Sequence, residues 1–312
     1  MAQQGSLRTS PLTGILFALG GSATLSVNDV AVKFLSGSYA LHQVILTRSL
    51  IGILVVLAAM VLSKQPLRTL RTRRAPEHLL RVVLVMVSNV SYFLGLAALP
   101  LADGVAIAFV SPLLVTALSV ILLGEKVGPR RWMAVAAGML GVVVMLRPGV
   151  DAVRPAALLV LLSALCYAST HIMTRRMKAT ESAFTLGFYV QLGFIVVSTV
   201  MGLLVGDGRY GGSTNPSLAF LLHEWEWPPL GDWPVFVATG FAVSIGGLLV
   251  AQAYRLNEAA LVAPFEYAAM PLAILWGVLV FHTWPDGTAW IGIALIIGAG
   301  LYILWRETRG QA

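Results

Sequence analysis

Residues 50–62 read LIGILVVLAAMVL, an apolar run without a charged residue, and residues 63–74 follow it as SKQPLRTLRTRR. Mostly apolar residues extend the run back to about position 41, which gives the roughly 20 residues that a helix needs to cross a membrane. Backbone groups in lipid must bond to one another, so such a run forms a helix. Basic residues behind a spanning helix favour the cytoplasmic side. These two stretches therefore predict a membrane helix that ends at a positively charged surface.

The same pattern recurs along the whole chain of 312 residues, of which 58% are hydrophobic and 11% charged. A soluble domain has about a quarter charged residues, and the mean hydropathy of +0.84 is far above what such a domain shows. Continuous apolar runs favour helices over the alternating strands of a barrel. The sequence predicts an all-α integral membrane protein with ten spanning helices, at about 12–34, 41–63, 78–99, 102–123, 130–147, 155–178, 182–205, 233–255, 258–281 and 287–305.

Several functional classes are excluded. The net charge of +7 is not gathered into a nucleic-acid-binding face, so we expect the lipid bilayer and a small molecule as partners, and no nucleic acid. The single cysteine, Cys166, excludes an intrachain disulfide and a multi-cysteine metal site. The chain has no G-x-x-x-x-G-K-[ST] phosphate loop, which excludes ATP hydrolysis, and no H-E-x-x-H pair. We expect no catalytic residues, no enzyme activity, no cofactor and no metal.

Lysine and arginine predict the orientation, because cytoplasmic connections carry an excess of both. With the N-terminus inside, only three of the 21 basic residues lie outside, namely Arg147, Arg154 and Arg209. Both termini are then cytoplasmic, and the protein lies in the cell membrane, which is the inner membrane in a bacterium. Apart from Lys33 and Arg48, which fall within helices, the others lie on the inner side: Arg8, Lys64, Arg68, Arg71, Arg73, Arg74, Arg81, Lys126, Arg130, Arg131, Arg175, Arg176, Lys178, Arg255, Arg306 and Arg309.

Segment 206–232 is the longest connection and lies outside in this topology. It is acidic and carries Trp225 and Trp227, with Trp233 next to it. Tryptophans favour the headgroup region, so we interpret it as an interfacial segment, with a substrate-gating lid as the alternative.

The second half of the chain repeats the first. Glu125, Trp132 and Gly141 match Thr283, Trp290 and Ala299 at a displacement of 158 residues, and Pro112 and Pro271 lie within one residue of it. We therefore expect two repeats, 1–150 and 151–312, the second with the 206–232 insertion. Five helices per repeat is an odd number, so the repeats must be inverted in the membrane, an arrangement typical of transporters with a site between the repeats.

Three motifs now carry a family resemblance that covers nearly the whole chain. They are Asn28-Asp29-Val30-Ala31-Val32-Lys33, Ser111-Pro112 and Leu123-Gly124-Glu125-Lys126. With the two five-helix repeats, the chain resembles EamA-type members of the drug/metabolite transporter superfamily. The second repeat departs from the pattern, with Phe281-His282-Thr283 where the family commonly has a Gly-Glu pair. A role for that glutamate is therefore not duplicated.

The resemblance implies a ten-helix secondary transporter with a central pocket lined by helices 1, 3, 4, 6, 8 and 9. The family includes importers and exporters of amino acids, vitamins, nucleotide-like compounds and other metabolites, so the resemblance does not identify the substrate.

Ionisable residues at membrane depth are functional candidates. Asp29 and Arg48 lie at similar depth, either as a structural pair or with Asp29 in contact with substrate or a proton and Arg48 in contact with a substrate carboxylate. Lys33 is close to the outer interface, and we expect its side chain to extend toward the membrane surface. His171 and Glu266 also match in depth, and an imidazole can exchange protons with a carboxylate. Proton coupling through Glu266 and His171 is our preferred hypothesis, and the alternative is a neutral Glu266 that only fixes its helix.

Neutral polar and aromatic residues gather at mid-depth on the helices that the resemblance assigns to the pocket. Such groups are typical of a small-ligand site, although each alone also suits interhelical bonding. We expect Pro112, Pro264 and Pro271 to kink their helices as gate hinges or static bends. The candidate substrate-binding residues are Asp29, Asn89, Tyr92, Ser111, Tyr167, Thr170, Ser244, Gln252 and Tyr267.

These features predict a secondary transporter, monomeric or homodimeric, that moves a small polar metabolite by alternating access with proton coupling or exchange. The carboxylates and Arg48 favour an amino acid or related zwitterion. A ring-bearing vitamin or nucleoside-like metabolite is the alternative substrate class. A membrane-embedded enzyme and a non-transporting receptor subunit are the alternatives of other classes.

Overall fold

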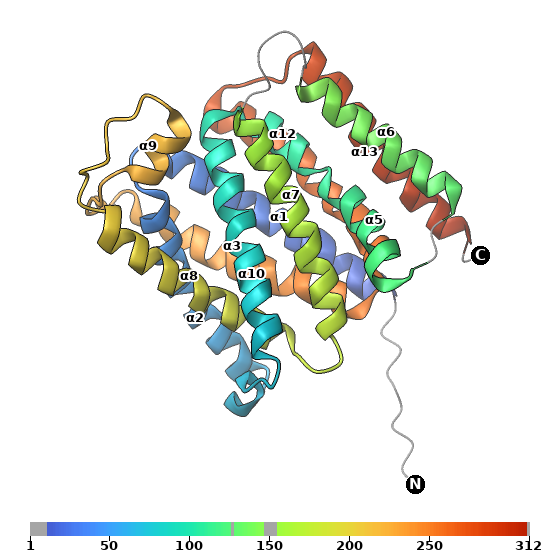
Figure 1. Ribbon diagram of the computed structural model, residues 1–312, viewed down its shortest axis with the longest axis horizontal. Coiled ribbons are helices and arrows are strands. Elements are labelled where there is room, and N and C mark those ends of the chain that lie inside the picture. The colour runs from blue at the N-terminus through green and yellow to red at the C-terminus, as the bar shows by residue number, and fades with distance from the viewer. Residues whose placement is uncertain (1–10, 126–127, 147–154, 311–312) are drawn as a thin grey trace.

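The computed structural model describes residues 11–125, 128–146 and 155–310 as a bundle of helices (Figure 1). Each of the ten predicted segments coincides with helical structure to within a few residues. The elements are α1 (Pro11–Leu35), α2 (Leu41–Leu62), η1 (Leu67–Leu70), α3 (Ala75–Ala98), α4 (Leu101–Ala108), α5 (Ser111–Leu123), α6 (Pro129–Leu146), α7 (Pro155–Met177), α8 (Ala183–Val205), α9 (Pro216–Leu222), α10 (Trp233–Leu256), α11 (Ala259–Val262), η2 (Ala263–Ala268), α12 (Ala269–Phe281) and α13 (Gly287–Gly310).

The length and apolar character of the helices identify a membrane protein. Within the described ranges, seven spans are long and apolar enough to cross a bilayer, and Phe265–Phe281 and Gly287–Ala299 are shorter apolar helices. Large apolar side chains also point outward, such as Leu54 and Leu203, which are 66% and 79% exposed. In water such a surface would drive association, whereas lipid accepts it.

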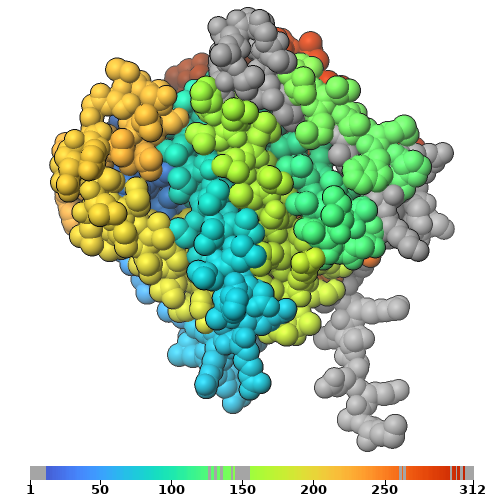
Figure 2. Space-filling model, in the orientation of Figure 1, coloured from blue at the N-terminus to red at the C-terminus, as the bar shows by residue number. Residues whose placement is uncertain are grey.

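The helices pair in a pattern that is unchanged when the two halves are exchanged. α1 packs along α10. Their counterparts in the other half, α7 for α1 and α3 for α10, pack along each other in the same way. α2 packs against its own equivalent α8, and α6 against α13. Figure 2 shows α3 and α7 side by side along the middle of one face. The core therefore lies between the halves rather than within each half.

Glycines allow the closest helix crossings. A Cβ on Gly95 of α3 would lie 2.5 Å from Val160 Cγ2 and 2.7 Å from the Ala156 carbonyl oxygen of α7. A Cβ on Gly21 of α1 would lie 2.6 Å from Val250 Cγ2 of α10. Small residues at such contacts let membrane helices approach each other.

The fourth and ninth predicted helices are each interrupted rather than continuous. The fourth breaks at Phe109 and Val110, between α4 and α5, and the ninth passes through α11 and η2 before α12. Pro112 and Pro264 lie in the first turn after each interruption, where a missing N–H is tolerated. Pro271 follows at the start of α12. Pro112 thus lies beside a short turn in the fourth helix and Pro264 within a 3-10 segment in the ninth.

The two interruptions meet at the centre of the bundle. Tyr267 Oη donates to the Phe109 carbonyl oxygen at 3.2 Å, and their ring centroids lie 5.3 Å apart. Tyr267 and Phe109 are separated by 158 residues, which is the repeat displacement. Equivalent residues of the two halves thus contact each other.

The repeat also extends to the ends of α5 and α12. Gly124 and His282, one repeat displacement apart, have φ angles of 69° and 54°. The following residues, Glu125 and Thr283, donate their backbone N–H to the carbonyl oxygens of Ser119 and Gly277. These bonds form the same helix-terminating motif in both halves.

Glu125, which has no glutamate counterpart in the second half, forms an ion pair in the first half. Glu125 lies 3.8 Å from Arg175 Nε on α7. The equivalent Thr283 instead donates its hydroxyl to the Gly277 carbonyl oxygen at 3.1 Å. The sequence departure at this position thus replaces an ion pair with a local cap.

The equivalent ends of α5 and α12 lie at opposite ends of the bundle. Leu122 of α5 accepts a hydrogen bond from Arg176, near the end of α7. Phe281 of α12 lies beneath Lys33, near the end of α1, and Lys33 also donates to the Leu96 and Leu99 carbonyl oxygens at 2.7 Å. The Lys33 ammonium group therefore caps the carbonyl end of α3, and its extension toward the membrane surface stays a prediction.

Segment 206–232 is attached to the bundle end formed by the α1–α2 connection. Trp225 Nε1 donates to His42 Nδ1 at 2.5 Å, and Tyr39 Oη donates to Asp232 Oδ2 at 2.5 Å. Phe220 of α9 is fully buried in the main apolar core, whereas Trp227 is 85% exposed. The segment therefore combines an anchored part with an exposed aromatic tip, and both interpretations of it stay open.

Candidate functional site

A cavity of about 170 Å³ lies between α1, α3, α4, α5, α7, α10, η2 and α12. Its wall carries two carboxylates and four aromatic rings together with small polar groups. This mixture of aromatic and polar groups is typical of a small-molecule site. We call it chamber 1; the lining residues used below are Ser22, Ser26, Asn28, Asp29, Ser88, Asn89, Tyr92, Phe93, Phe109, Ser111, Ser163, Tyr167 and Glu266.

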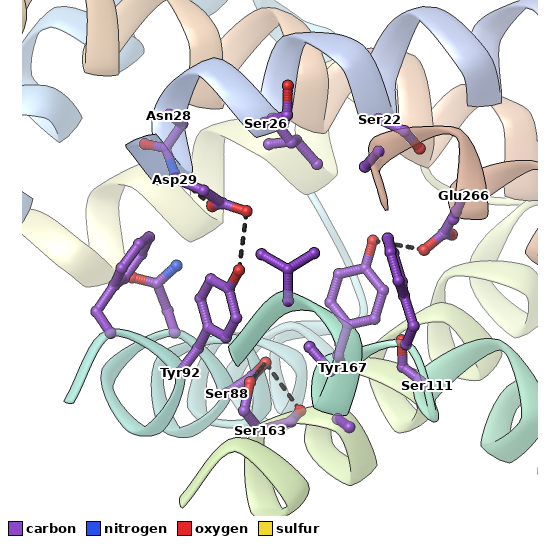
Figure 3. Close-up of a pocket in the computed structure, with 18 of the residues that line it drawn as sticks. Ser22, Ser26, Asn28, Asp29, Ser88, Tyr92, Ser111, Ser163, Tyr167 and Glu266 are labelled. Carbon is purple, nitrogen blue, oxygen red and sulfur yellow. Dashed lines mark hydrogen bonds between the residues drawn. The ribbon is translucent and has the colours of Figure 1, made fainter. Parts of the chain in front are cut away.

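Two tyrosine–carboxylate pairs dominate chamber 1. Tyr92 on α3 donates its hydroxyl to Asp29 Oδ2 on α1 at 2.9 Å. Tyr167 on α7 donates to Glu266 Oε2 on η2 at 3.1 Å. Figure 3 shows both tyrosines rising from the same side of the chamber toward carboxylates on the other side. The predicted residues Asp29, Tyr92, Tyr167 and Glu266 are therefore brought together.

Arg48 is fully buried behind this wall. Its guanidinium donates to the side-chain oxygens of Asn28 and Asn89 and lies between the Phe93 and Phe194 rings, 5.3 and 5.4 Å from their centroids. Asn28 in turn donates to Asp29 Oδ1 at 3.4 Å. Arg48 and Asp29 are thus linked through Asn28 rather than by a direct ion pair, and Arg48 lines neither chamber 1 nor the second cavity described below.

Glu266 has two hydroxyl donors, because Tyr254 Oη also donates to its Oε1 at 2.6 Å. His171 stacks on the Tyr254 ring and meets the Tyr167 ring edge-on, both with centroids 4.1 Å apart. His171 is therefore close to Glu266 but separated from it by two tyrosines. Both of its ring nitrogens are buried without a hydrogen-bond partner in the described part of the chain.

A second cavity of about 170 Å³, chamber 2, adjoins chamber 1 between α1, α2, α3, α7, α8 and α10. The two chambers share wall residues, among them Ser88, Asn89 and Tyr167. Chamber 2 is also lined by Arg81, Thr170, His171, Gln191 and Ser244. Gln191 Nε2 donates to Ser244 Oγ at 3.0 Å.

The predicted binding residues thus divide among the two chambers and the surrounding walls. Asp29, Tyr92 and Ser111 line chamber 1, Thr170 and Ser244 line chamber 2, and Asn89 and Tyr167 line both. Two predicted residues lie elsewhere. Gln252 accepts from Arg255 near the end of α10, and Tyr267 bonds to Phe109 at the helix interruptions.

Sequence reasoning missed several wall residues. Ser88 and Ser163 bond across α3 and α7, with Ser88 Oγ 3.0 Å from the Ser163 carbonyl oxygen. Isolated serines in apolar helices give no periodic signal that separates a cavity wall from a helix contact. The sequence pattern likewise did not identify three other wall residues, which are Phe93, Phe109 and Gln191. The charge of Arg81 placed it among the residues of the cytoplasmic side. In the structure it lies on α3 and is buried within the bundle, with 7% of its surface exposed.

Comparison with known proteins gives a consistent result along the whole chain. A family model described as the EamA-like transporter family matches twice, over residues 12–147 and 154–305. A riboflavin transporter of Rhizobium johnstonii is 28% identical over 99% of this chain and 97% of its own length, and one of Vibrio cholerae is 30% identical over 97% of each. An S-adenosylmethionine uptake transporter of Rickettsia prowazekii is 25% identical over 96% of this chain and 95% of its own length.

These similarities identify a multi-pass transporter of the cell membrane rather than an enzyme, and they imply a small-molecule substrate. Two tandem family matches account for the repeat seen in the sequence and in the helix pairing. The chain belongs to the EamA-like transporter family of the drug/metabolite transporter superfamily.

Proposed function

We propose that this chain is a secondary active transporter that carries a small ring-bearing metabolite through chamber 1 by alternating access. The observation that supports this most is the wall of chamber 1, which carries four aromatic rings, those of Tyr92, Phe93, Phe109 and Tyr167. Aromatic faces bind planar ligands with little loss of conformational freedom. Riboflavin and S-adenosylmethionine, the substrates named for the relatives, each contain a fused ring.

Hydrogen-bonding groups at both ends of chamber 1 suit the rest of such a molecule. Asp29 and Glu266 can accept from ring N–H or hydroxyl groups, and Ser22, Ser26 and Ser111 offer hydroxyls. A riboflavin-like compound, with a ring and a polyol chain, would use both features. It is our leading substrate class.

An amino acid or another zwitterion is the second candidate, and the two carboxylates favour it. Asp29 and Glu266 would attract an ammonium or another cationic centre. Arg48 does not serve this class as the sequence suggested, because it lies outside the chamber walls.

Alternating access would use the two repeats, 1–150 and 151–312, as inverted units with both termini in the cytoplasm. Two observations support inversion. The helix pairing is the same when the two halves are exchanged, and the ends of α5 and α12 lie at opposite ends of the bundle. Pro112, Pro264 and Pro271, beside the interrupted helices, are the proposed hinges. The chain would act as a monomer or a homodimer.

Glu266 is the proposed coupling residue for protons. Its carboxylate faces chamber 1, and the rings of its two hydroxyl donors, Tyr167 and Tyr254, pack against His171 on the wall of chamber 2. A carboxylate that gains and loses a proton can change its bonds to both tyrosines. Such a change would couple transport to the proton gradient, with His171 as the exchange partner.

A thermal-shift screen of the purified protein tests the substrate class. Ligands that bind only the folded state raise its stability by mass action, by about 2.7 kcal/mol at 100 times Kd. We expect riboflavin or another fused-ring compound to raise the melting temperature, with the shift reduced in Asp29→Asn. Stabilisation by amino acids alone would favour the zwitterion, and no stabilisation by any of these compounds would contradict both proposals.

A further inference from the structure

Arg81 is a buried cation beside a cavity, and its bonds within the described ranges are to neutral groups. Its Nε donates to Thr174 Oγ1 at 3.0 Å, and its Nη1 donates to the Leu186 carbonyl oxygen at 3.1 Å. A guanidinium has five N–H donors, so these two bonds leave donors for another acceptor. Burying a charge costs several kcal/mol unless an opposite charge offsets it. Arg81 is therefore arranged to receive an anion.

The charges on the chamber 2 wall strengthen this conclusion. Its ionisable side chains from α3 and α7 are Arg81 and His171, and its lining residues from α1, α2, α8 and α10 are neutral. His171 is 5% exposed, and neither ring nitrogen has a hydrogen-bond partner in the described ranges. The Gln191–Ser244 pair adds further polar groups to the wall. Chamber 2 thus offers donors and positive charge to whatever enters it.

Other cations buried at membrane depth have more partners. Arg48 has two amide oxygens, two aromatic faces and the nearby Asp29, although its Nε has no hydrogen-bond partner among the described residues. Lys33 has two carbonyl oxygens at the end of α3. Arg175 has Glu125 and the Asn257 carbonyl oxygen. Of these four cations, only Arg81 lines either chamber.

The adjoining chambers are oppositely charged. Chamber 1 carries the acidic residues Asp29 and Glu266, whereas chamber 2 carries Arg81, and both share Ser88, Asn89 and Tyr167. A ligand that spans the shared wall would place its ring, and any cationic centre, in chamber 1. Its anionic end would then face Arg81.

We propose that chamber 2 binds the anionic group, a carboxylate or a phosphate, of the transported metabolite, with Arg81 as the residue that recognises it. This inference deepens the proposed function and rests on it. It predicts that a ring compound with an acidic substituent is bound more tightly than the corresponding neutral ring compound.

Riboflavin and riboflavin 5′-phosphate form a matched pair of probes, because they differ only in the phosphate. We expect the wild-type protein to bind the phosphate about tenfold more tightly, since a hydrogen bond to a charged group contributes about 1.5–3 kcal/mol. In Arg81→Gln the two affinities should become equal, and in Arg81→Lys an intermediate preference should persist. Arg68→Gln, at an exposed site in η1, is the matched control and should retain the wild-type preference.

Inorganic phosphate alone separates this inference from the substrate class. We expect it to raise the melting temperature of the wild-type protein and of Arg68→Gln, but not of Arg81→Gln. If neither flavin binds but phosphate stabilises in this Arg81-dependent way, the ring proposal fails and the anion site stands. If both flavins bind equally to the wild-type protein and phosphate has no Arg81-dependent effect, the anion site is refuted while the proposed function stands.

The remaining source of an anion is a lipid headgroup. The melting temperature of the purified protein with added phosphatidylglycerol tests whether a lipid headgroup is the anion. Phosphatidylcholine, which has no net charge, is the control. Stabilisation through Arg81 by phosphatidylglycerol, without any by inorganic phosphate or the flavin phosphate, would overturn the assignment to the transported metabolite. Should Arg81→Gln fail to fold, the comparison of the two flavins on the wild-type protein still decides the proposal.

Discussion

At the residue scale, the site is built from two similar pairs, Tyr92 with Asp29 and Tyr167 with Glu266. The tyrosines come from one helix of each half, α3 and α7, that pack along each other. Each pair joins a ring that can contact a planar ligand to a carboxylate that can accept its N–H or hydroxyl groups. Recognition and proton binding thus occupy the same wall.

Replacing Glu266 with glutamine tests the coupling role. The amide of Glu266→Gln would keep an oxygen that accepts from Tyr167 or Tyr254 but could not bind and release a proton, so we expect the fold to persist and the stimulation of transport by an imposed pH gradient to be lost. Uptake into proteoliposomes with and without the gradient measures this. Glu258→Gln, at an exposed position before α11, is the control. Unchanged proton dependence in Glu266→Gln would exclude Glu266 as the coupling residue.

Much of this wall could be predicted from sequence, because polar groups in apolar helices are costly and therefore conspicuous. Asp29, Tyr92, Tyr167 and Glu266 were found in this way. Their partners could not be found: Tyr254 approaches Glu266 from α10, and Asn28 mediates between Asp29 and Arg48. Such contacts depend on how neighbouring helices are rotated, which depth along a helix does not specify.

At the element scale, the equivalent ends of α5 and α12 carry different residues at the same position, and substitution can test the difference. Gly124 and His282 both lie in the left-handed region, where a side chain costs about 1–2 kcal/mol. We expect His282→Gly to raise the stability of the protein by about 1 kcal/mol and Gly124→Ala to lower it by a similar amount. Thermal unfolding in detergent measures both. A lower melting temperature for His282→Gly would mean that its side chain contributes more than the backbone strain costs.

The close approach of α3 and α7 depends on Gly95. Valine there would meet the Ala156 carbonyl oxygen and Val160, and overpacking of this kind costs about 1–3 kcal/mol. We therefore expect Gly95→Val to lower the melting temperature and to impair ligand binding, because these helices carry Tyr92 and Tyr167. Gly298→Val is the control, since a Cβ at Gly298 would have no neighbour within 4 Å. Equal effects of the two substitutions would contradict this packing.

Helix positions followed from apolar length, and the predicted boundaries agree to within a few residues. The interruptions did not follow, because proline alone does not distinguish a kinked α-helix from one that changes to a turn or a 3-10 segment. Tyr267, predicted to bind substrate, instead joins the two interruptions through Phe109. Contacts between equivalent residues become visible only when the two halves are packed together.

At the scale of the whole molecule, the topology makes a prediction for labelling. The native Cys166 is buried, so we expect it not to react with a labelling reagent. Labelling of a variant then reports the accessibility of its added cysteine. We expect a membrane-impermeant maleimide to label Leu230→Cys on intact cells, and Gln65→Cys only after the membrane is opened. Leu230 is 90% exposed and Gln65 follows α2 at its basic end. The reverse labelling pattern would invert the proposed orientation.

The repeat was visible in the sequence at a displacement of 158 residues, and it led to the expectation of a site between two halves. Opposite charge in two adjoining chambers was not visible. Arg81 and His171 come from different halves, and Arg81 resembled a loop cation because it lies close to the basic segment 63–74. Its burial depends on α7 and α8 closing over it through Thr174 and Leu186.

Counterflow of labelled riboflavin into proteoliposomes preloaded with unlabelled riboflavin tests the central claim most directly. We predict accumulation of label by the wild-type protein, with strong loss in Tyr167→Ala, which removes an aromatic wall of chamber 1. Tyr210→Ala, at an exposed loop position, should transport normally. Absence of counterflow for riboflavin and for every other fused-ring metabolite tested, by folded wild-type protein, would contradict the account.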